Sequence, residues 1–152
     1  MASQKLREYL NQNQVSYTSI AHPIAYSTRE ISHLCHVSEN QLAKSVMINV
    51  GNKLAMVVLP ASFIVDFEKL KKSLHETNVS LATETEFNAI FSDCELGAMP
   101  PFGNLYNVEV YVEKSLGNNR EIVFNAGTHT EVIKLAYQDF LALVHPKVIT
   151  AH

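Results

Sequence analysis

The sequence has few cysteines and no long apolar run. Its 152 residues include two cysteines, Cys35 and Cys94, which lie far apart and form no C-x-x-C pair. This spacing argues against a disulfide framework or a zinc knuckle and predicts two buried, reduced thiols. No apolar run approaches the roughly 20 residues of a membrane span, and charges occupy the first residues, where a secretory signal would be apolar. We therefore expect a cytoplasmic protein with no membrane partner.

Positive charge is also scarce. Twelve lysines and arginines against 15 aspartates and glutamates give a formal net charge of −3, whereas nonspecific nucleic-acid binding depends on a broad basic excess. A nucleic-acid partner would have to be held locally. The patch of Lys69, Lys71 and Lys72 either contributes to such a contact or is a solvated helix face. With 47% hydrophobic and 18% charged residues, residues 1–152 are expected to form a single globular domain.

Local patterns predict hairpins mixed with helices. The clearest is KSVMINV, Gly51-Asn52 and KLAMVVL, two apolar strands around a two-residue turn. Ser3, Ser27, Asp66 and Thr83 are helix N-cap candidates, and Ser38 is a candidate cap of a very short helix. The helix after Thr83 is expected to bury Phe87, Ile90 and Phe91. Further strands are predicted at 15–21, 79–82, 107–113, 121–125 and 131–136, and a closing helix near 138–145.

The order of these elements predicts the fold class. Strands 107–113 and 121–125 are expected to form a second hairpin around Gly117-Asn118-Asn119. Hairpins and helices mix without βαβ regularity. We therefore predict an α+β fold with a mixed, largely antiparallel sheet or an open barrel, surrounded by helices.

Residues 97–104, GAMPPFGN, contain two of the five glycines and two of the five prolines in the chain. Proline fixes φ and removes an N–H, while glycine adopts conformations closed to other residues. Neither a helix nor a central strand can therefore continue through this octet. The segment is predicted to be a loop, either a packed turn or a rigid frame that aims backbone amides at a ligand.

Lys44 is a second candidate for chemistry. If 44–50 is a strand, alternation places Lys44 on the apolar side with Val46, Ile48 and Val50. Its ammonium then either extends to solvent at the strand end or enters a pocket mouth, where it would suit a phosphate. The stretch 125–130, NAGTHT, is a polar turn between two strands and is either a surface turn or part of the same site.

No established catalytic motif is present. The sequence contains no G-x-S-x-G elbow, P-loop, G-x-G-x-x-G fingerprint or H-E-x-x-H motif. His33 and His36 have a helical spacing that can share a metal ion, but no third ligand is identified. We therefore expect neither a metal nor a cofactor, and an enzyme with this sequence would have no recognisable protein nucleophile.

Three features in series resemble the YbaK and prolyl-tRNA synthetase editing-domain family. They are Lys44 entering the first hairpin, Gly97-x-x-x-Pro101 in a loop after a helix ending at Phe91, and Asn125-Ala126-Gly127 after a strand. His22-Pro23 and Thr28 also resemble the N-terminal pattern of the family. The resemblance covers residues 15–140. It implies an α+β fold and a stand-alone trans-editing aminoacyl-tRNA deacylase, which hydrolyses the ester of a mischarged tRNA of the proline type.

The resemblance also implies roles for single residues. Lys44 would contact a phosphate or ribose of the tRNA 3′ end, and the Gly97 and Ala98 amides would bind the substrate carbonyl or the terminal ribose. The other residues expected to bind substrate are Thr28, Met99, Pro100, Pro101, Gly127, Thr128, His129 and Thr130. An aminoacyl-tRNA synthetase is a possible partner. The alternative is a catalytically silent module of the same fold that binds a tRNA end, a nucleotide or a protein.

Overall fold

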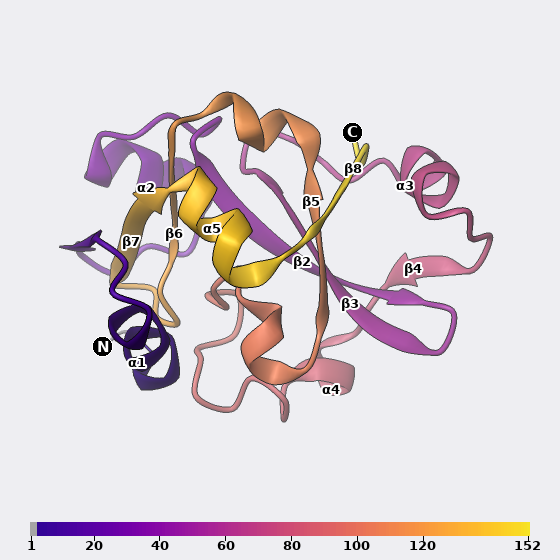
Figure 1. Cartoon of the computed structure of the whole chain (residues 1–152), viewed down its shortest axis with the longest axis horizontal. Coiled ribbons are helices and arrows are strands. Elements are labelled where there is room, and N and C mark those ends of the chain that lie inside the picture. The colour runs from indigo at the N-terminus through magenta and orange to yellow at the C-terminus, as the bar shows by residue number, and fades with distance from the viewer. Residues whose placement is uncertain (1–2) are drawn as a thin grey trace.

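The computed structural model describes residues 3–152, so the first two residues of the expected 1–152 domain lie outside the described part (Figure 1). The helices are α1 (Gln4–Gln12), α2 (Thr28–Cys35), α3 (Phe67–Leu74), α4 (Glu84–Phe87) and α5 (Tyr137–Val144), with 3-10 turns η1 (Gly103–Tyr106) and η2 (Lys114–Asn118). The strands are β1 (Tyr17–Ala21), β2 (Leu42–Val50), β3 (Lys53–Pro60), β4 (Val79–Leu81), β5 (Glu109–Glu113), β6 (Glu121–Asn125), β7 (Glu131–Ala136) and β8 (Lys147–Ile149).

The strands form one mixed sheet. Its order is β1-β7-β6-β2-β3-β5-β8, and β4 pairs with β2 outside this path. The pairs β1–β7, β6–β7, β2–β3 and β2–β4 are antiparallel, while β2–β6, β3–β5 and β5–β8 are parallel. The predicted α+β fold with a mixed sheet and surrounding helices is therefore confirmed.

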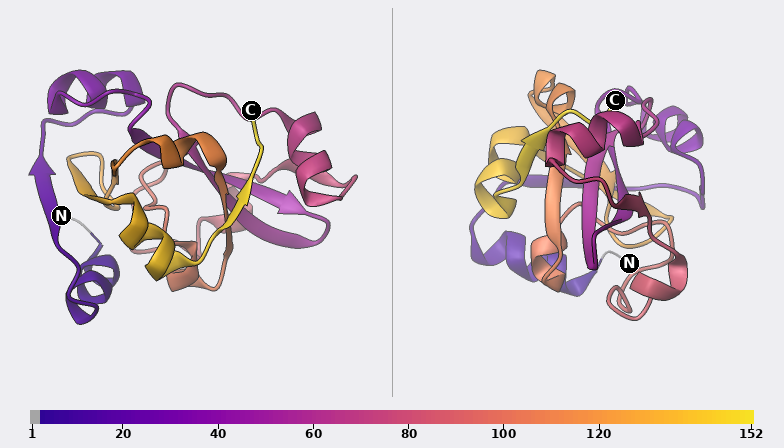
Figure 2. Two further views of the ribbon diagram at one scale, coloured as in Figure 1. Left: turned by 45° about the horizontal axis from the view of Figure 1, so that its top comes forward. Right: turned by 90° about the vertical axis from the view of Figure 1, so that its right-hand side faces the viewer.

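Helices cover both faces of the sheet because the central strands are apolar on both sides. On one face, Met47 and Met56 pack with side chains of α1 and α5, and the segment 87–106 completes this core. On the other face, Ile48 and Val57 pack with Leu70 of α3, while α2 closes a smaller cluster over β6 and β7. Figures 1 and 2 show α2 and α3 at opposite ends of the molecule.

The predicted first hairpin is confirmed. Strands β2 and β3 pair from Ala43↔Pro60 to Val50↔Lys53 around Gly51-Asn52. Gly51 has a φ of +61°, a conformation that glycine adopts without the steric penalty of a side chain. The short connection fixes the register of the two longest strands, which in turn fixes the position of Lys44.

The predicted second hairpin is wrong. Strand β5 pairs in parallel with β3 and β8, and β6 pairs with β7 and β2. The turn η2 lies between β5 and β6 and carries the chain to a different part of the sheet. Strand β8, a partner of β5, was not predicted. Parallel pairs join residues far apart in sequence, so no local turn signal reveals them.

Smaller predictions also need correction. Ser38 begins a turn that leads into β2, with Gln41 N–H donating to Ser38 O at 3.0 Å, and no helix forms there. The helix after Thr83 ends at Phe87, which leaves Ile90 40% exposed.

Cys35 and Cys94 are free thiols, as predicted, but they are only partly buried. Within residues 3–152, every helix is too short or too polar to cross a membrane.

Candidate functional site

The sheet opens beside the middle of β2. Strand β6 pairs with β2 only at Leu42 and Ala43, and β4 pairs with it only from Ile48 to Val50. Between these ladders the one backbone contact on this edge in the described chain is Ala82 N–H to Met47 O, at 3.0 Å. Loops therefore flank the stretch that begins with Lys44.

A cavity of about 400 Å³ lies at this opening. Its walls come from β2, from the segment around α4 and from the Gly97 loop. The lining residues are Ser45, Val46, Met47, Leu81, Ala82, Glu84, Phe87, Leu96, Gly97 and Met99. The volume falls within the usual range for small-ligand pockets, and apolar walls with few polar groups are typical of them.

Hydrogen bonds join the Gly97 loop to the NAGTHT turn. Glu95 N–H donates to Gly127 O at 2.8 Å, and Gly127 N–H donates to Ala98 O at 2.9 Å. The His129 N–H donates to Glu95 Oε1 at 2.7 Å, and its Nε2 lies 2.8 Å from Leu96 O. The two predicted site segments therefore form one unit, although 30 residues separate Gly97 from Gly127 in the sequence.

The segment before α2 joins the same unit. His22 N–H donates to Thr130 O at 2.8 Å, and Ala25 N–H donates to His129 O at 3.1 Å. The ring of Tyr26 packs against His129 with 4.7 Å between centroids. Beside them the hydroxyl oxygens of Thr128 and Thr130 are 3.2 Å apart. The structure thus brings together three of the predicted motifs.

Gly97 presents an available amide at the cavity. Its φ of +83° is a left-handed conformation, and its N–H has no acceptor within residues 3–152. The Ala98 N–H differs, because it donates to Glu95 O at 3.0 Å inside a turn and Ala98 is fully buried. Gly97 thus has a free backbone donor, whereas the Ala98 amide holds the loop in shape; the expectation that both amides contact the substrate stays a prediction.

The remainder of GAMPPFGN is a rigid frame. Pro100 and Pro101 are buried, and Met99 lines the cavity. Phe102 is fully buried, with ring centroids 5.6 Å from Phe124 and 5.9 Å from Phe140. Core packing thus fixes one end of the loop, and the contacts to the NAGTHT turn fix the other.

Lys44 directly precedes Ser45 in β2, so strand alternation places its side chain on the other face of the sheet. Its side chain is half-buried, and burial lowers its pKa, an effect that nearby Glu39 partly offsets. Within residues 3–152, no carboxylate forms a salt bridge with its ammonium. A cation that is partly desolvated and unpaired is suited to bind an anionic group. Lys44 does not line the 400 Å³ cavity itself.

Four residues of the candidate segments carry a buried polar atom without a hydrogen-bond partner within residues 3–152. These atoms are Ser45 Oγ, Asn125 Oδ1, His129 Nδ1 and His22 Nε2. Such atoms are rare in folded proteins unless a ligand or water contacts them. Because Leu96 O can only accept, His129 Nε2 carries a proton, and Nδ1 of the neutral ring is an acceptor.

Sequence reasoning missed two residues of this site. Ser45 follows Lys44, and strand alternation assigned it to the opposite face without showing that a cavity lies there. Tyr26 lies between the two N-terminal motifs, His22-Pro23 and Thr28, and no local pattern distinguishes it from any surface aromatic. Thr28 is the first residue of α2 and is half-buried.

Other candidates lie elsewhere. His36 ends α2 in a left-handed conformation, and residues 3–152 contain no group of three or more His, Cys, Asp or Glu side chains that could hold a metal ion. The lysine patch is on α3, at the end of the molecule away from β7, and Lys71 pairs with Glu68 at 3.5 Å.

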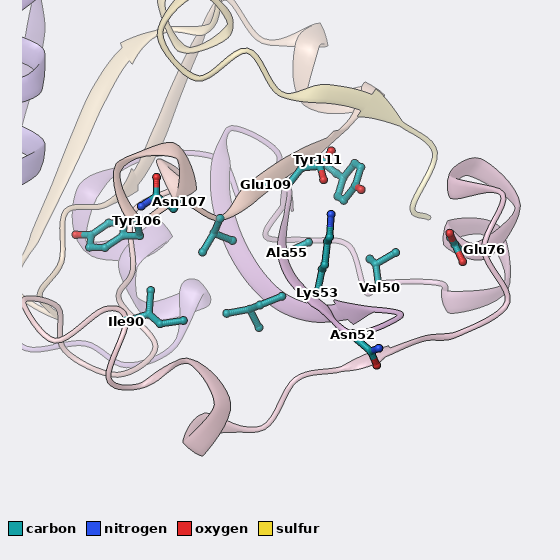
Figure 3. Close-up of a pocket in the computed structure, with 12 residues that line it drawn as sticks. Val50, Asn52, Lys53, Ala55, Glu76, Ile90, Tyr106, Asn107, Glu109 and Tyr111 are labelled. Carbon is teal, nitrogen blue, oxygen red and sulfur yellow. The ribbon is translucent and has the colours of Figure 1, made fainter.

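A second cavity, of about 860 Å³, lies between the start of β3 and the start of β5 (Figure 3). Figure 3 shows Lys53 extended toward Tyr111. None of the predicted site residues lines this cavity, and neither does any of the described buried polar atoms that lack a hydrogen-bond partner. The opening beside Lys44 is therefore the better candidate.

Cys94 is close to the Gly97 loop but is not a reactive thiol. Burial raises its pKa to about 11, so the thiol stays protonated at neutral pH. We expect iodoacetamide at pH 8 to alkylate Cys94 about 100-fold more slowly in the folded protein than in guanidinium, because the thiolate is the nucleophile. Mass spectrometry of timed samples measures both rates. Equally fast alkylation in the folded state would contradict this environment.

Gly127 is required where the N-terminus meets the site. Its φ is +102°, and an added Cβ would lie 3.1 Å from Ser3 N and Ser3 Cβ. We expect Gly127→Ala to lower the free energy of unfolding by about 1–3 kcal/mol, measured by urea denaturation. Gly51→Ala is the control, because Gly51 also has positive φ but open space around its Cβ position. A cost no larger than that of Gly51→Ala would show that the Ser3 contact is unimportant.

Comparisons with known proteins agree with this geometry. Residues 22–143 match the model of the aminoacyl-tRNA editing domain. The sequence has no match among curated proteins. Solved structures with similar folds include hypothetical protein APE2540, with a TM-score of 0.87 at 17% identity over 97% of this chain and 99% of that chain.

Two further structures are similar. A candidate trans-editing enzyme for prolyl tRNA synthetase has a TM-score of 0.83 at 17% identity, over 98% of this chain and 95% of that chain. A protein from work on epitope backbone grafting onto scaffolds by computational design has a TM-score of 0.85 at 17% identity, with 98% and 95% covered. At this identity the structural likenesses show the fold.

Proposed function

Because the chain belongs to the aminoacyl-tRNA editing domain family, we propose that it is a deacylase that hydrolyses the ester between a wrong amino acid and the 3′ end of tRNA. The expected tRNA is of the proline type, in keeping with one structural neighbour described as a candidate trans-editing enzyme for prolyl tRNA synthetase. Editing is needed because a synthetase pocket discriminates one methylene by only about 1–3 kcal/mol.

One observation carries the proposal. Ser45 and Gly97, whose N–H has no acceptor within residues 3–152, line one cavity, and His129 packs on the Gly97 loop through its contact with Leu96 O. Lys44, which forms no salt bridge in the described chain, precedes Ser45 in β2. This arrangement supplies donors, an acceptor and a cation, but no activated nucleophile. It fits a substrate that is already an activated ester and carries phosphates next to the reacting bond.

The chemistry requires only water and positioned polar groups. The oxygen of water bonds to the ester carbonyl carbon, and the carbonyl oxygen becomes an oxyanion that the Gly97 N–H stabilises. The bond from this carbon to the ribose oxygen then breaks. A proton from the attacking water passes to the ribose oxygen, and the amino acid is released. A hydroxyl or thiol of the substrate can assist in orienting the water.

The proposed residue roles follow from position. Lys44 binds a phosphate or ribose of the tRNA end, and Gly97 binds the developing oxyanion. The buried prolines hold Gly97 at a fixed position, which avoids reorganisation during the reaction. His129 and its neighbouring threonines, from the turn that packs on the Gly97 loop, read the aminoacyl side chain. Gly127 and Met99 complete the pocket wall, and Thr28 contributes from α2.

We also propose a domain organisation, a cellular location and a partner for this chain. We propose that residues 1–152 act as a single domain in the cytoplasm, where tRNA is charged, without a metal or cofactor. The family match supports action on aminoacyl-tRNA. An aminoacyl-tRNA synthetase is a proposed partner, since it would deliver newly mischarged tRNA. It would also supply a basic tRNA-binding surface, which this chain, with a net charge of −3, offers only sparingly.

The test is deacylation of a panel of alanyl, cysteinyl and seryl forms of tRNA for proline, with release of the amino acid measured over time. We expect at least one member to be hydrolysed faster than in buffer, at the same rate with EDTA present. Loss of activity in EDTA would overturn the metal-free mechanism. Rates equal to buffer across the panel would overturn the proposed enzyme.

The alternative is a binding module without catalysis. It is favoured by one observation: within residues 3–152 the cavity lining contains no activated nucleophile, and burial keeps the thiol of nearby Cys94 protonated by raising its pKa to about 11. A non-hydrolysable aminoacyl-adenosine analogue distinguishes the two proposals. Tight binding of the analogue together with no turnover of the corresponding ester would support the module.

A further inference from the structure

Exposed apolar side chains gather at the candidate site. Leu81 and Leu96 line its cavity and are 63% and 43% exposed. Tyr26 is 70% exposed and packs on His129, whose Cε1 lies 3.6 Å from the Cβ position of Gly97. A solvent-facing tyrosine thus stands one side chain away from the proposed reaction centre. Exposed apolar groups that cluster at a cavity mark a binding surface.

The Tyr26 ring is exposed but firmly held. Ala25, the residue before it, is buried and donates its N–H to His129 O at 3.1 Å. Ser27, the residue after it, caps α2 by accepting the Glu30 N–H at 3.1 Å. The ring lies 4.7 Å from the His129 ring between centroids, tilted by 55°, and Tyr26 remains 70% exposed. Tyr26 therefore offers an exposed aromatic ring whose neighbours in the chain are held by hydrogen bonds.

We propose that Tyr26 stacks with the terminal adenine base of the tRNA. This rests on the proposed function, in which the scissile ester is attached to the ribose of the terminal adenosine. When the ester carbonyl is bound at Gly97, the terminal adenine is separated from that carbonyl by one ribose. The Tyr26 ring is separated from Gly97 by one side chain, that of His129. Aromatic side chains stack on bases in single-stranded nucleic acid, and each such contact contributes substantially to affinity.

The charge of the protein supports a stacking contact over an ionic one. The net charge is −3, so phosphate binding alone supplies little affinity. Stacking of a base on the uncharged Tyr26 ring does not require positive charge on the protein. The competing occupant of this surface is a protein partner that covers the apolar rim, and the control variant below separates that case.

The test uses uncharged tRNA for proline whose terminal adenine is replaced by 2-aminopurine, a base whose fluorescence falls when it stacks. We compare wild type with Tyr26→Ala, Tyr26→Phe and Ile24→Ala, the last being an exposed apolar residue of the same segment. We expect wild type and Tyr26→Phe to quench the probe with Kd values within about twofold of each other. Tyr26→Ala should raise Kd about five- to 100-fold and remove the quench.

Hydrolysis of the panel substrate gives the second measurement. Tyr26→Ala should raise KM by a similar factor and leave kcat at saturation within about twofold. An unchanged Kd and KM would overturn the stacking role, as would a fall in kcat alone. Equal loss in Ile24→Ala would also overturn it and would indicate a general apolar contact such as a protein partner.

The experiments distinguish failure of the Tyr26 stacking proposal from failure of the deacylase proposal. The 2-aminopurine measurement needs no hydrolysis, so quenching that depends on Tyr26 in a protein without activity would contradict the deacylase and support the subsite. Hydrolysis by wild type with no effect of Tyr26→Ala would contradict the subsite and support the deacylase. No quenching by wild type at saturating protein would overturn the subsite directly.

Discussion

Lys44→Ala is expected to lower kcat/KM for aminoacyl-tRNA hydrolysis by about 10- to 100-fold, the loss of one charge-assisted contact to the substrate. Lys44 is half-buried and forms no salt bridge in the described chain, so its ammonium is available to an anionic ligand, which we propose to be the tRNA end. Its removal takes no ion pair from the fold. Thermal unfolding should therefore be nearly unchanged.

Lys53→Ala is the matched control for this prediction. Lys53 lies in the other strand of the same hairpin, is exposed and lines the cavity shown in Figure 3. It should retain wild-type kcat/KM. Steady-state rates and Tm values of the three proteins are the measurement. Equal activity of Lys44→Ala and wild type, or a loss of activity that follows a loss of folding, would argue against Lys44 as a substrate contact.

Phe102→Ala is expected to have the largest effect on stability, lowering the free energy of unfolding by about 3–5 kcal/mol. Phe102 is fully buried and meets the rings of Tyr9, Phe124 and Phe140 at centroid distances of 6.3, 5.6 and 5.9 Å. These rings come from α1, β6 and α5, so truncation leaves a cavity between three elements that cannot collapse around it.

Phe63→Ala provides the comparison, because Phe63 is only partly buried and stacks on His152 near the surface. Its cost should be smaller than that of Phe102→Ala. Urea denaturation followed by circular dichroism measures both variants. A cost below about 1 kcal/mol for Phe102→Ala would mean that the Gly97 loop is not anchored in the core as described.

Local structure was largely predictable because local physics determines it. Alternation and the Gly51-Asn52 turn gave the hairpin of β2 and β3, and the capping residues Ser27 and Asp66 gave the starts of α2 and α3. The α+β class followed from the order of these elements. The likeness to the editing-domain family is confirmed by the family match over residues 22–143.

Long-range pairing was not predictable. The parallel partners of β5 lie in β3 and β8, more than 30 residues away in both directions, and its strand pattern is compatible with any neighbour. The expected hairpin with β6 failed because a turn signal cannot show where the chain goes after η2. The short strand β8 carries no alternation long enough to be recognised.

The site was predicted as three motifs but not as an arrangement. Gly97, Gly127 and His129 were named as candidates, and hydrogen bonds from Gly127 and His129 to the neighbours of Gly97 (Glu95, Leu96 and Ala98) bring the three close together. The sequence did not show that Ala98 N–H is already engaged, since this depends on the turn at Glu95. It also did not reveal Tyr26, whose importance comes from its contact with His129.

The most direct test of the account is the rate at which the purified protein releases amino acid from alanyl, cysteinyl and seryl tRNA for proline, relative to buffer. We expect at least one ester to be hydrolysed clearly faster with the protein than in buffer, and correctly charged prolyl-tRNA to be spared. Rates equal to buffer for all three mischarged forms would contradict the proposed deacylase.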